Sequence, residues 1–208
     1  MSGMPQRIET QPFFGEFIEG RRGEILDAAL AVFAEKGYGA GTMRDIAARV
    51  GVTEPALYRY FSGKQVLFGT LIETAGGRIR SEALELIDTI RPEAMRASLL
   101  VAIDDRRAAL RRYAPLMRTM LVAASHDEES LRVLRTTIVY PVIGRVAQLV
   151  RTVDTHFGLE RSDDQRAQAL RAFVSLFVGT IVTSLVLEDS PDAEVVDAML
   201  RVMGWDAS

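Results

Sequence analysis

The sequence predicts an all-α fold, and three observations lead to it. Apolar residues recur at spacings of three and four along most of the 208 residues, which is the period of a helix with one buried face. No segment keeps the strict apolar–polar alternation of a half-buried strand. Glycine, proline and serine–aspartate turn signals separate the helical stretches. Helices are expected at residues 21–36, 43–50, from about 54, 65–90, 92–112, 114–125, 128–156, 163–188 and 191–203.

Composition limits the classes of protein that this chain can belong to. Apolar residues make up 48% and charged residues 25%, as in soluble globular proteins. The absence of cysteine excludes disulfides, thiol catalysis and cysteine-ligated zinc. The N-terminus has no basic segment followed by an apolar stretch, so we expect a cytoplasmic protein. Residues 21–64 hold seven Lys or Arg and five Asp or Glu, a net charge of +2, whereas the whole chain carries −3. The remainder is therefore −5, and this small asymmetry has the sign that contact with a polyanion requires.

The first expected helix, 21–36, carries one apolar stripe formed by Ile25, Ala28, Ala29, Val32 and Phe33. Gly37 should end it. The glycine-rich stretch 37–41 does not have the spacing of a phosphate-binding loop and no strand precedes it, so we interpret it as a link between helices.

The next stretch, TMRDIAARVGVTEPALYRYFSGK at 42–64, reads as two short helices joined by a glycine and followed by a third. Thr42 with Asp45 three residues later is a variant of the capping box. Gly51 supplies the positive φ that ends a helix and turns the chain. Thr53 then caps a second helix whose first turn contains Pro55. Two helices joined in this way form either a helix-turn-helix, whose second helix enters the major groove of DNA, or an ordinary helical hairpin.

Two further features favour the DNA-binding interpretation. Leu57 and Phe61 face inward at i and i+4, which leaves the run Tyr58-Arg59-Tyr60 largely on the surface as donors to phosphate oxygens. Ser62 and Gln65 form a regular capping box that places Lys64 in the first turn of the next helix. A lysine there opposes the helix dipole unless an anion is near.

These residues resemble the DNA-binding domain of the TetR family of bacterial transcriptional regulators. The matching pieces lie between Arg22 and about Leu71: ILDAALAVFAEKGY, TMRDIAARVGV and LYRYFSGKQVLF. The resemblance implies a three-helix helix-turn-helix domain at 21–66 and a helical ligand-binding and dimerisation domain at 67–208, and it leaves residues 1–20 as an N-terminal extension that it does not cover. It also implies a palindromic DNA operator, a homodimer and a small-molecule effector as partners, and no membrane.

The resemblance assigns roles within the predicted DNA site. Positions 54–56 and 58 (Glu54, Pro55, Ala56, Tyr58) would face base edges or nearby backbone beside the cap Thr53, while Thr42, Arg44, Tyr60 and Lys64 would hold phosphates. Glu54 either accepts a hydrogen bond from a cytosine amino group or caps its own helix. Arg59 either binds phosphate or lies on the outer face.

The run 172–187 is apolar on nearly every side, which predicts a buried helix. Its 16 residues fall short of the roughly 20 needed to cross a bilayer. It is either a core helix of a monomer or, as the resemblance implies, part of a dimeric four-helix bundle formed by 163–203. The residues expected at that interface are Val174, Val178, Gly179, Val182, Val195, Val196, Met199, Leu200 and Met203.

An effector pocket in an all-α domain would be lined by apolar side chains with a few polar ones. The segments 113–121 and 138–143 supply candidates, with Arg118 as a partner for an anionic head, although such residues are more often ordinary core and such an arginine is more often solvated. The pocket candidates are Met117, Arg118, Leu121, Tyr140, Phe173 and Phe177. Pro141 within a helical stretch should kink the helix and free a backbone carbonyl.

Signals for an enzyme are missing from the sequence. His126 and His156 lack the Glu-x-x-His pattern of di-iron bundles, and they are interpreted as solvated residues near helix ends. There is no His-Glu-x-x-His, G-x-S-x-G or Walker motif. We therefore expect no catalytic residue, no metal and no cofactor.

Three functions remain. The first is a homodimeric repressor that a small, largely hydrophobic ligand releases from its operator. The second is an activator or ligand-independent regulator of the same architecture. The third is a helical protein that binds hydrophobic molecules and has no DNA role. For the N-terminal extension, we expect Phe13, Phe14, Phe17 and Ile18 to dock on the first domain, Arg7, Arg21 and Arg22 to reach toward the minor groove, and residues 1–11 to fray.

Overall fold

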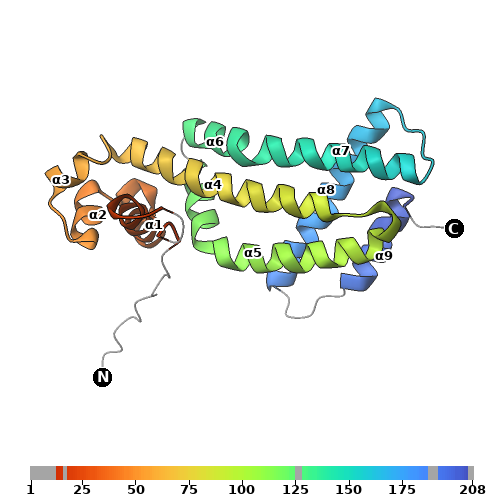
Figure 1. Cartoon of the computed structure of the whole chain (residues 1–208), viewed down its shortest axis with the longest axis horizontal. Helices are drawn as coiled ribbons and strands as arrows, with labels where there is room; N and C mark the ends of the chain where they lie inside the picture. The colour runs from red at the N-terminus through yellow and green to blue at the C-terminus, as the bar shows by residue number, and fades with distance from the viewer. Residues whose placement is uncertain (1–12, 16–17, 125–127, 187–191, 206–208) are drawn as a thin grey trace, which may run out of the picture. The chain divides into compact units, whose positions relative to one another are not determined.

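The computed structural model describes residues 13–15, 18–124, 128–186 and 192–205, and this part of the chain forms helices without a strand (Figure 1). The all-α prediction is confirmed. The helices are α1 (Arg21–Ala40), α2 (Met43–Val50), α3 (Glu54–Tyr58), α4 (Lys64–Thr89), α5 (Met95–Ala124), α6 (Glu128–Leu134), α7 (Tyr140–His156), α8 (Asp163–Val186) and α9 (Asp192–Met203). A 3₁₀ turn, η1 (Pro92–Ala94), precedes α5, and a π-helical turn, η2 (Arg135–Val139), precedes α7.

The chain divides into two compact units. The first unit comprises Met1–Gly76 and Pro115–Leu134, and the second comprises Gly77–Ala114 and Arg135–Ser208. Helices α4 and α5 each contribute residues to both units. This division lies further along α4 than the domain boundary predicted after residue 66, which stays a prediction.

The first unit is built on α1, whose predicted stripe is buried. Ile25 and Ala29 have no exposed surface, and Phe33 retains 2%. Gly37 has φ 79° and ψ 157°, so the helix is interrupted there before a last turn at 38–40. The positive φ is the conformation that glycine adopts most easily, which explains why the regular helix stops at this residue.

Helix α2 has the bounds and both ends that the sequence predicts. The Asp45 N–H donates to Thr42 Oγ1 at 3.1 Å, and the Thr42 N–H donates to Asp45 Oδ2 at 3.0 Å, which completes the capping box. Gly51 has φ 77° and ψ 35°, the left-handed conformation of a helix C-terminus. Helix α3 follows after Thr53, whose Oγ1 accepts from the Ala56 N–H at 3.4 Å.

Two boundary predictions need correction. Helix α4 begins at Lys64, and the Gly63 carbonyl accepts from the Leu67 N–H at 3.0 Å, so the N-cap is Gly63 and not Ser62. Helix α5 is continuous from Met95 to Ala124, whereas two helices separated near residue 113 were expected.

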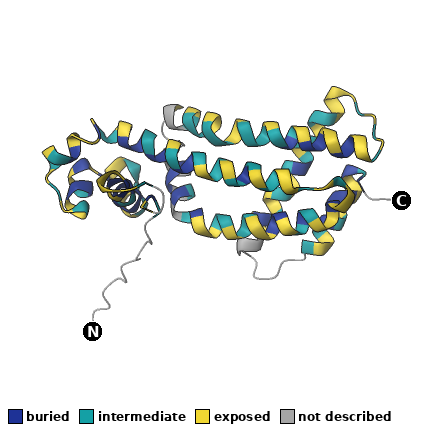
Figure 2. Ribbon diagram, in the orientation of Figure 1, coloured by how far each residue is buried: buried dark blue, intermediate teal, exposed yellow. Residues whose placement is uncertain are grey.

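In the second unit, one apolar core joins α5, α7, α8 and α9. Figure 2 shows buried residues along the facing sides of these helices, and Trp205, just beyond α9, is 2% exposed within this core. The Trp205 Nε1–H donates to Oδ1 of the buried Asp154 at 2.9 Å. Arg161 lies 3.3 Å from the same oxygen, so the charge of the buried carboxylate is paired.

Pro141 lies in the first turn of α7, directly after η2, and the carbonyl that the sequence expects it to free accepts from a side chain, while the expected kink stays a prediction. Proline has no N–H, so it cannot donate to the carbonyl four residues earlier, that of Thr137. The Arg80 side chain from α4 supplies a donor to that carbonyl, with Nη1 at 3.2 Å from the Thr137 oxygen. The helix passes through a π-helical turn at this point, a local widening that often accompanies such a disruption.

The described part of the N-terminal extension docks on α1, as expected. Phe14 has no exposed surface, and the Asp27 carboxylate accepts from the backbone N–H groups of Phe13, Phe14 and Gly15 at 2.7, 2.7 and 2.9 Å. The predictions for Arg7, Phe17 and residues 1–11 lie outside the described residues.

Candidate functional site

The helix-turn-helix presents a polar face around α3. Leu57 and Phe61 are 0% and 1% exposed and anchor this segment to the interior of the first unit, as predicted. Tyr58 and Tyr60 are 46% and 43% exposed, and Arg59 and Pro55 also lie on the surface. The structure therefore leaves two phenols and a guanidinium free to meet a ligand outside the protein.

Thr42 and Asp45 form a tightly bonded pair at the start of α2. The Thr42 hydroxyl donates to Asp45 Oδ2 at 2.7 Å, and Lys36 lies 2.6 Å from Asp45 Oδ1. The hydrogen bond from Lys36, reinforced by those from Thr42, lowers the pKa of Asp45 to about 2. Both donors of Thr42 are thus already used, so a phosphate contact by this residue would compete with the helix cap.

Lys64 has partners within the protein. Its ammonium donates to the Gly39 carbonyl at 3.1 Å and lies 4.5 Å from the centre of the Tyr38 ring. Burial lowers the pKa of Lys64. A carbonyl and an aromatic face can therefore balance this cation at the N-terminus of α4, where the sequence suggested that an anion was needed.

The arginines of this unit differ in how they are held. Arg49 forms a two-pronged pair with Glu35 at 2.7 and 2.6 Å, which ties α2 to α1. Arg22 lies 4.6 Å from the centre of the Phe61 ring. Among the contacts of the described residues, none holds the exposed side chains of Arg44 or Arg59. These two are the cations most readily available to an external phosphate.

The second unit contains an apolar cavity of about 230 Å³. Helices α4, α5, α7 and α8 all contribute to its wall, and in Figure 1 the first three run alongside one another while α8 crosses behind them. The lining residues are Ala83, Leu86, Ile87, Ile90, Ala102, Arg106, Val142, Ile143, Val146, Leu149, Phe173, Val174, Phe177, Val178 and Ile181. Among these described residues, Arg106 alone carries a polar side chain.

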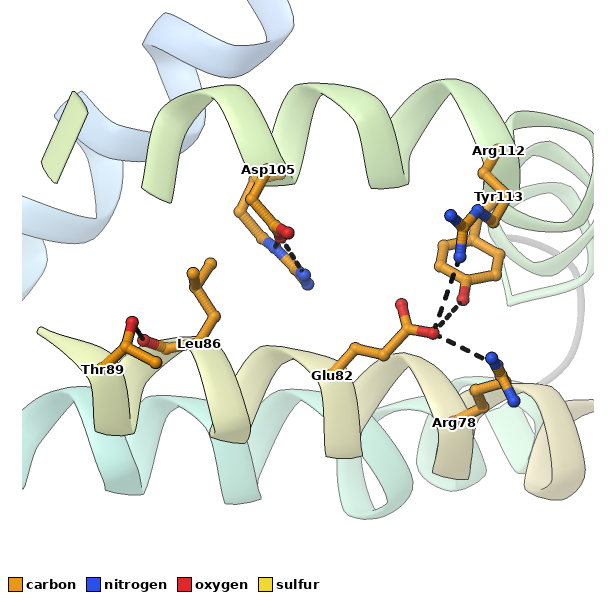
Figure 3. Close-up of polar contacts among 8 residues, drawn as sticks. Arg78, Glu82, Leu86, Thr89, Asp105, Arg112 and Tyr113 are labelled. Carbon is orange, nitrogen blue, oxygen red and sulfur yellow. Dashed lines mark hydrogen bonds and ion pairs between the residues drawn. The ribbon is translucent and has the colours of Figure 1, made fainter. Parts of the chain in front are cut away.

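A polar network lies one turn along α4 from this cavity. Figure 3 shows Glu82 pointing toward Tyr113 and Arg112 on α5, with Arg78 on its other side. Glu82 accepts from the Tyr113 hydroxyl at 2.7 Å and from Arg78 Nε at 3.1 Å, and Arg112 lies 3.9 Å away. Burial raises the pKa of Tyr113, which keeps the hydroxyl protonated as a donor.

Two of the six predicted pocket residues, Phe173 and Phe177, line this cavity, with their rings stacked at 5.9 Å. Tyr140 is 60% exposed and outside the lining, and Met117 belongs to the first unit, so neither is part of it. The side chains of Arg118 and Leu121 lie outside the described residues. The sequence missed the contributions of α4 and α5, because apolar helix faces give no sign of which residues border empty space.

Seven of the nine predicted interface residues divide into two groups, and the other two, Val174 and Val195, are partly buried against the core of the second unit. Val196, Met199, Leu200 and Met203 are buried inside the second unit, where they form its core and expose too little surface to meet a second chain. On α8, Val178 and Val182 are 50% and 49% exposed, and Gly179 is exposed between them. The predicted dimer interface therefore keeps only the exposed residues of α8.

No group of three or more metal-ligating side chains occurs among the residues that the structure describes. His156 is exposed at the end of α7, edge-on to Phe157 at 5.0 Å, and His126 is outside the described residues. One described helical stretch, Leu131–His156, is long and apolar enough to cross a membrane by length and composition, with 17% of its apolar window buried. A single stretch of this kind is weak support for a membrane protein, since core helices of soluble proteins meet the same criterion.

The capped α2, the left-handed glycine, the short α3 and its exposed face define a helix-turn-helix protein. Residues 25–71 match the family model described as bacterial regulatory proteins, tetR family. Residues 25–71 therefore form a DNA-binding domain of the TetR family type, and the chain as a whole is similar to helix-turn-helix transcriptional regulators. This family is one of regulators and not of enzymes, and its members are in general cytoplasmic dimers that bind DNA operators and small-molecule effectors.

Similar proteins extend this comparison over most of the chain. The uncharacterized HTH-type transcriptional regulator YfiR of Bacillus subtilis (strain 168) is 27% identical over 86% of this chain and 87% of its own length. The HTH-type transcriptional repressor KstR2 of Rhodococcus jostii (strain RHA1) is 38% identical over 38% of this chain and 45% of its own. The structure of the transcriptional regulator FadR from Bacillus subtilis in complex with stearoyl-CoA has the same fold, with a TM-score of 0.65 and 18% identity over 88% of this chain and 97% of that one.

Proposed function

We propose that this protein is a cytoplasmic, homodimeric repressor that binds a palindromic operator and leaves it when a small, largely hydrophobic ligand enters the cavity of the second unit. The exposed face of α3, held by the buried Leu57 and Phe61, is the observation that carries the DNA role. The direction of regulation is part of the proposal, since the relatives of this chain include the repressor KstR2 of Rhodococcus jostii and the activator FasR of Mycolicibacterium smegmatis.

The DNA contacts are proposed on chemical grounds. Tyr58, Tyr60, Arg44 and Arg59 supply donors to phosphates around the base-reading positions 54–56. Glu54 is half-buried in the first turn of α3, where a carboxylate interacts favourably with the helix dipole. Its two roles, contact with a cytosine and stabilisation of its own helix, are compatible with this position.

A dimer meets a physical requirement of this mode of binding. A single short recognition helix makes few contacts, whereas a twofold dimer places two of them about 34–36 Å apart on one side of the duplex. The exposed apolar residues of α8 around Gly179 are the surface that we assign to this contact. A glycine there permits close approach of a helix from the second copy.

Helix α4 offers a route by which the ligand can act on DNA binding. It begins beside the helix-turn-helix and its second half lines the cavity. A ligand that binds one position of α4 more tightly than another shifts the population between two dimer geometries and thereby changes the separation of the α3 helices.

The proposal is tested by electrophoretic mobility shift with DNA from upstream of the protein's own gene, with and without candidate ligands. We expect Tyr58→Phe to lower affinity by a similar factor for every DNA sequence, because it removes a phosphate donor. Lys64→Ala should also reduce the salt dependence by about one unit in the slope of log affinity against log salt. Arg151→Ala, at an exposed arginine on α7, is the matched control and should leave DNA binding unchanged.

Unchanged DNA binding in both the Tyr58 and Lys64 variants would reject this site. A Lys64 variant with lower stability and an unchanged salt slope would assign that residue to its contacts with Gly39 and Tyr38 alone. Tight ligand binding with no specific DNA binding would favour the second candidate, a helical protein for hydrophobic molecules, which the apolar cavity supports.

A further inference from the structure

One charged residue, Arg106, lies in the wall of the cavity and restricts the kinds of ligand that the cavity can bind. Fourteen of the fifteen lining residues are apolar, and the remaining one, Arg106, contributes from α5. Its side chain is 17% exposed. A cation with so little access to water beside an apolar space is costly unless an anion accompanies it.

The anion that accompanies Arg106 in this structure is a poor partner. It is Asp105, the preceding residue, whose Oδ2 accepts from both Nε and Nη2 of the guanidinium. Adjacent residues on a helix do not face each other, and the Asp105 side chain is 48% exposed, so water competes for it. Only one carboxylate oxygen is used, which leaves the guanidinium donors at Nη1 unused among the described contacts.

Among the contacts of the described residues, Asp105 is the one carboxylate that pairs with Arg106. Glu82, on the facing side of α4, is already held by Tyr113 and Arg78 (Figure 3). Leu86, one turn further along α4, points into the space between the two helices and lines the cavity. The apolar wall and a guanidinium with unused Nη1 donors therefore lie next to each other on the same side of α5.

We propose that the cavity takes an apolar molecule that carries one carboxylate, with the hydrocarbon part inside and the carboxylate bound by Arg106. This inference rests on the proposed ligand-binding role of the second unit and names the class of ligand. The volume sets the size: an engineered cavity of about 150 Å³ holds benzene, so about 230 Å³ holds roughly nine or ten non-hydrogen atoms. Octanoate has this size and this chemistry.

The chain contains a reporter for binding at this place. Trp205 is its one tryptophan, and the Trp205 ring lies 5.5 Å from the ring of Phe173, which lines the cavity. Isothermal titration calorimetry gives the affinity, and Trp205 fluorescence shows whether the ligand reaches the cavity. Neither measurement needs DNA.

The test compares three probes of equal chain length: octanoate, 1-octanol and octylammonium. We expect octanoate to bind about tenfold to a hundredfold more tightly than 1-octanol, the range of a charge-assisted hydrogen bond, and octylammonium to bind most weakly. Arg106→Gln should remove the preference for octanoate, and Arg106→Lys should restore part of it. Arg111→Gln, an exposed arginine on the same helix, should keep the full preference.

Ala102→Leu provides a second variant that does not depend on the arginine. Because Ala102 lines the cavity, a larger side chain should weaken octanoate and 1-octanol alike. Equal affinity for octanoate and 1-octanol, an unchanged preference in the Arg106→Gln variant, or no binding of octanoate at millimolar concentration would each overturn the proposal. Octanoate binding that depends on Arg106 but leaves DNA affinity unchanged would uphold this inference and reject only the effector mechanism.

Discussion

The two compact units of this protein use their helices in opposite ways. In the first unit, apolar anchors such as Leu57 and Phe61 are fully enclosed, and the groups available for recognition lie outside on α3. In the second unit, four helices enclose an apolar space and the recognition group, Arg106, lies in its wall. In the first unit, close packing of the core holds α3 in place so that its outer face can bind. In the second unit, the space that the helices leave unfilled is itself the proposed binding site.

The largest expected effect tests the anchoring of α3. Leu57→Ala should lower the free energy of unfolding by about 2–5 kcal/mol, since it leaves a cavity beneath a five-residue helix. DNA affinity should fall with it. Urea unfolding followed by circular dichroism measures the stability, with Val202→Ala, at a 67% exposed position, as a control expected within about 0.5 kcal/mol of wild type. A loss as small as that of the control would show that α3 is not held by this side chain.

The next prediction applies one change to both units. Ala47→Leu in α2 should destabilise the protein by about 1–3 kcal/mol, because Ala47 is 2% exposed against α1. Ala102→Leu, at a residue 1% exposed that borders the cavity, should cost less than about 1 kcal/mol, because there is space for the added atoms. If urea titrations gave the two variants equal losses in the free energy of unfolding, the core near Ala102 would be packed as closely as that near Ala47, and the proposed difference between the units would be wrong.

Tyr113→Phe tests the polar network beside the cavity. Removing the hydroxyl takes one charge-assisted hydrogen bond from Glu82, and we expect a loss of about 1–2 kcal/mol in the free energy of unfolding. The phenyl ring and its packing are kept, so thermal unfolding should remain a single transition. No measurable loss would mean that Arg78 alone satisfies the carboxylate.

The smallest effect concerns Asp45 and acid. Its pKa in the folded protein is about 2, below the ordinary value of 3.8, so its contribution is complete above that value and is lost as the pH falls toward 2. Asp45→Asn should therefore flatten the decline of the melting temperature between these two pH values. Asp197→Asn, whose lowered pKa depends on Arg96, gives the matched change in the second unit. A decline identical to that of the wild type would show that Lys36 and Thr42 do not stabilise the ionised Asp45.

The part of the fold that the sequence predicts well is the part that local chemistry determines. The capping pair Thr42–Asp45 and Gly51 mark both ends of α2 because each acts within one helical turn. The helix break expected near residue 113 is absent, and α5 is continuous there. Tyr113 is bonded to Glu82 on α4, 31 residues away in sequence, and local sequence patterns do not reveal a contact of this kind.

The cavity could not be predicted, for a related reason. Phe173 and Phe177 were found because large apolar residues are common in pockets, but the same argument selected Tyr140, which is exposed. Arg106 lies in a stretch with several other arginines, and only the packing of α5 shows that Arg106 borders the cavity whereas Arg111 is exposed.

The bond from Arg80 to the Thr137 carbonyl has a consequence for how α4 can move. A helix advances 1.5 Å per residue, so an axial displacement of α4 by one residue would break this 3.2 Å bond unless the Arg80 side chain changes its conformation to follow the oxygen. The Thr137 carbonyl, which has no backbone donor at Pro141, would then also lose the hydrogen bond from Arg80. Sliding of α4 therefore costs either this hydrogen bond or the change of side-chain conformation that keeps it.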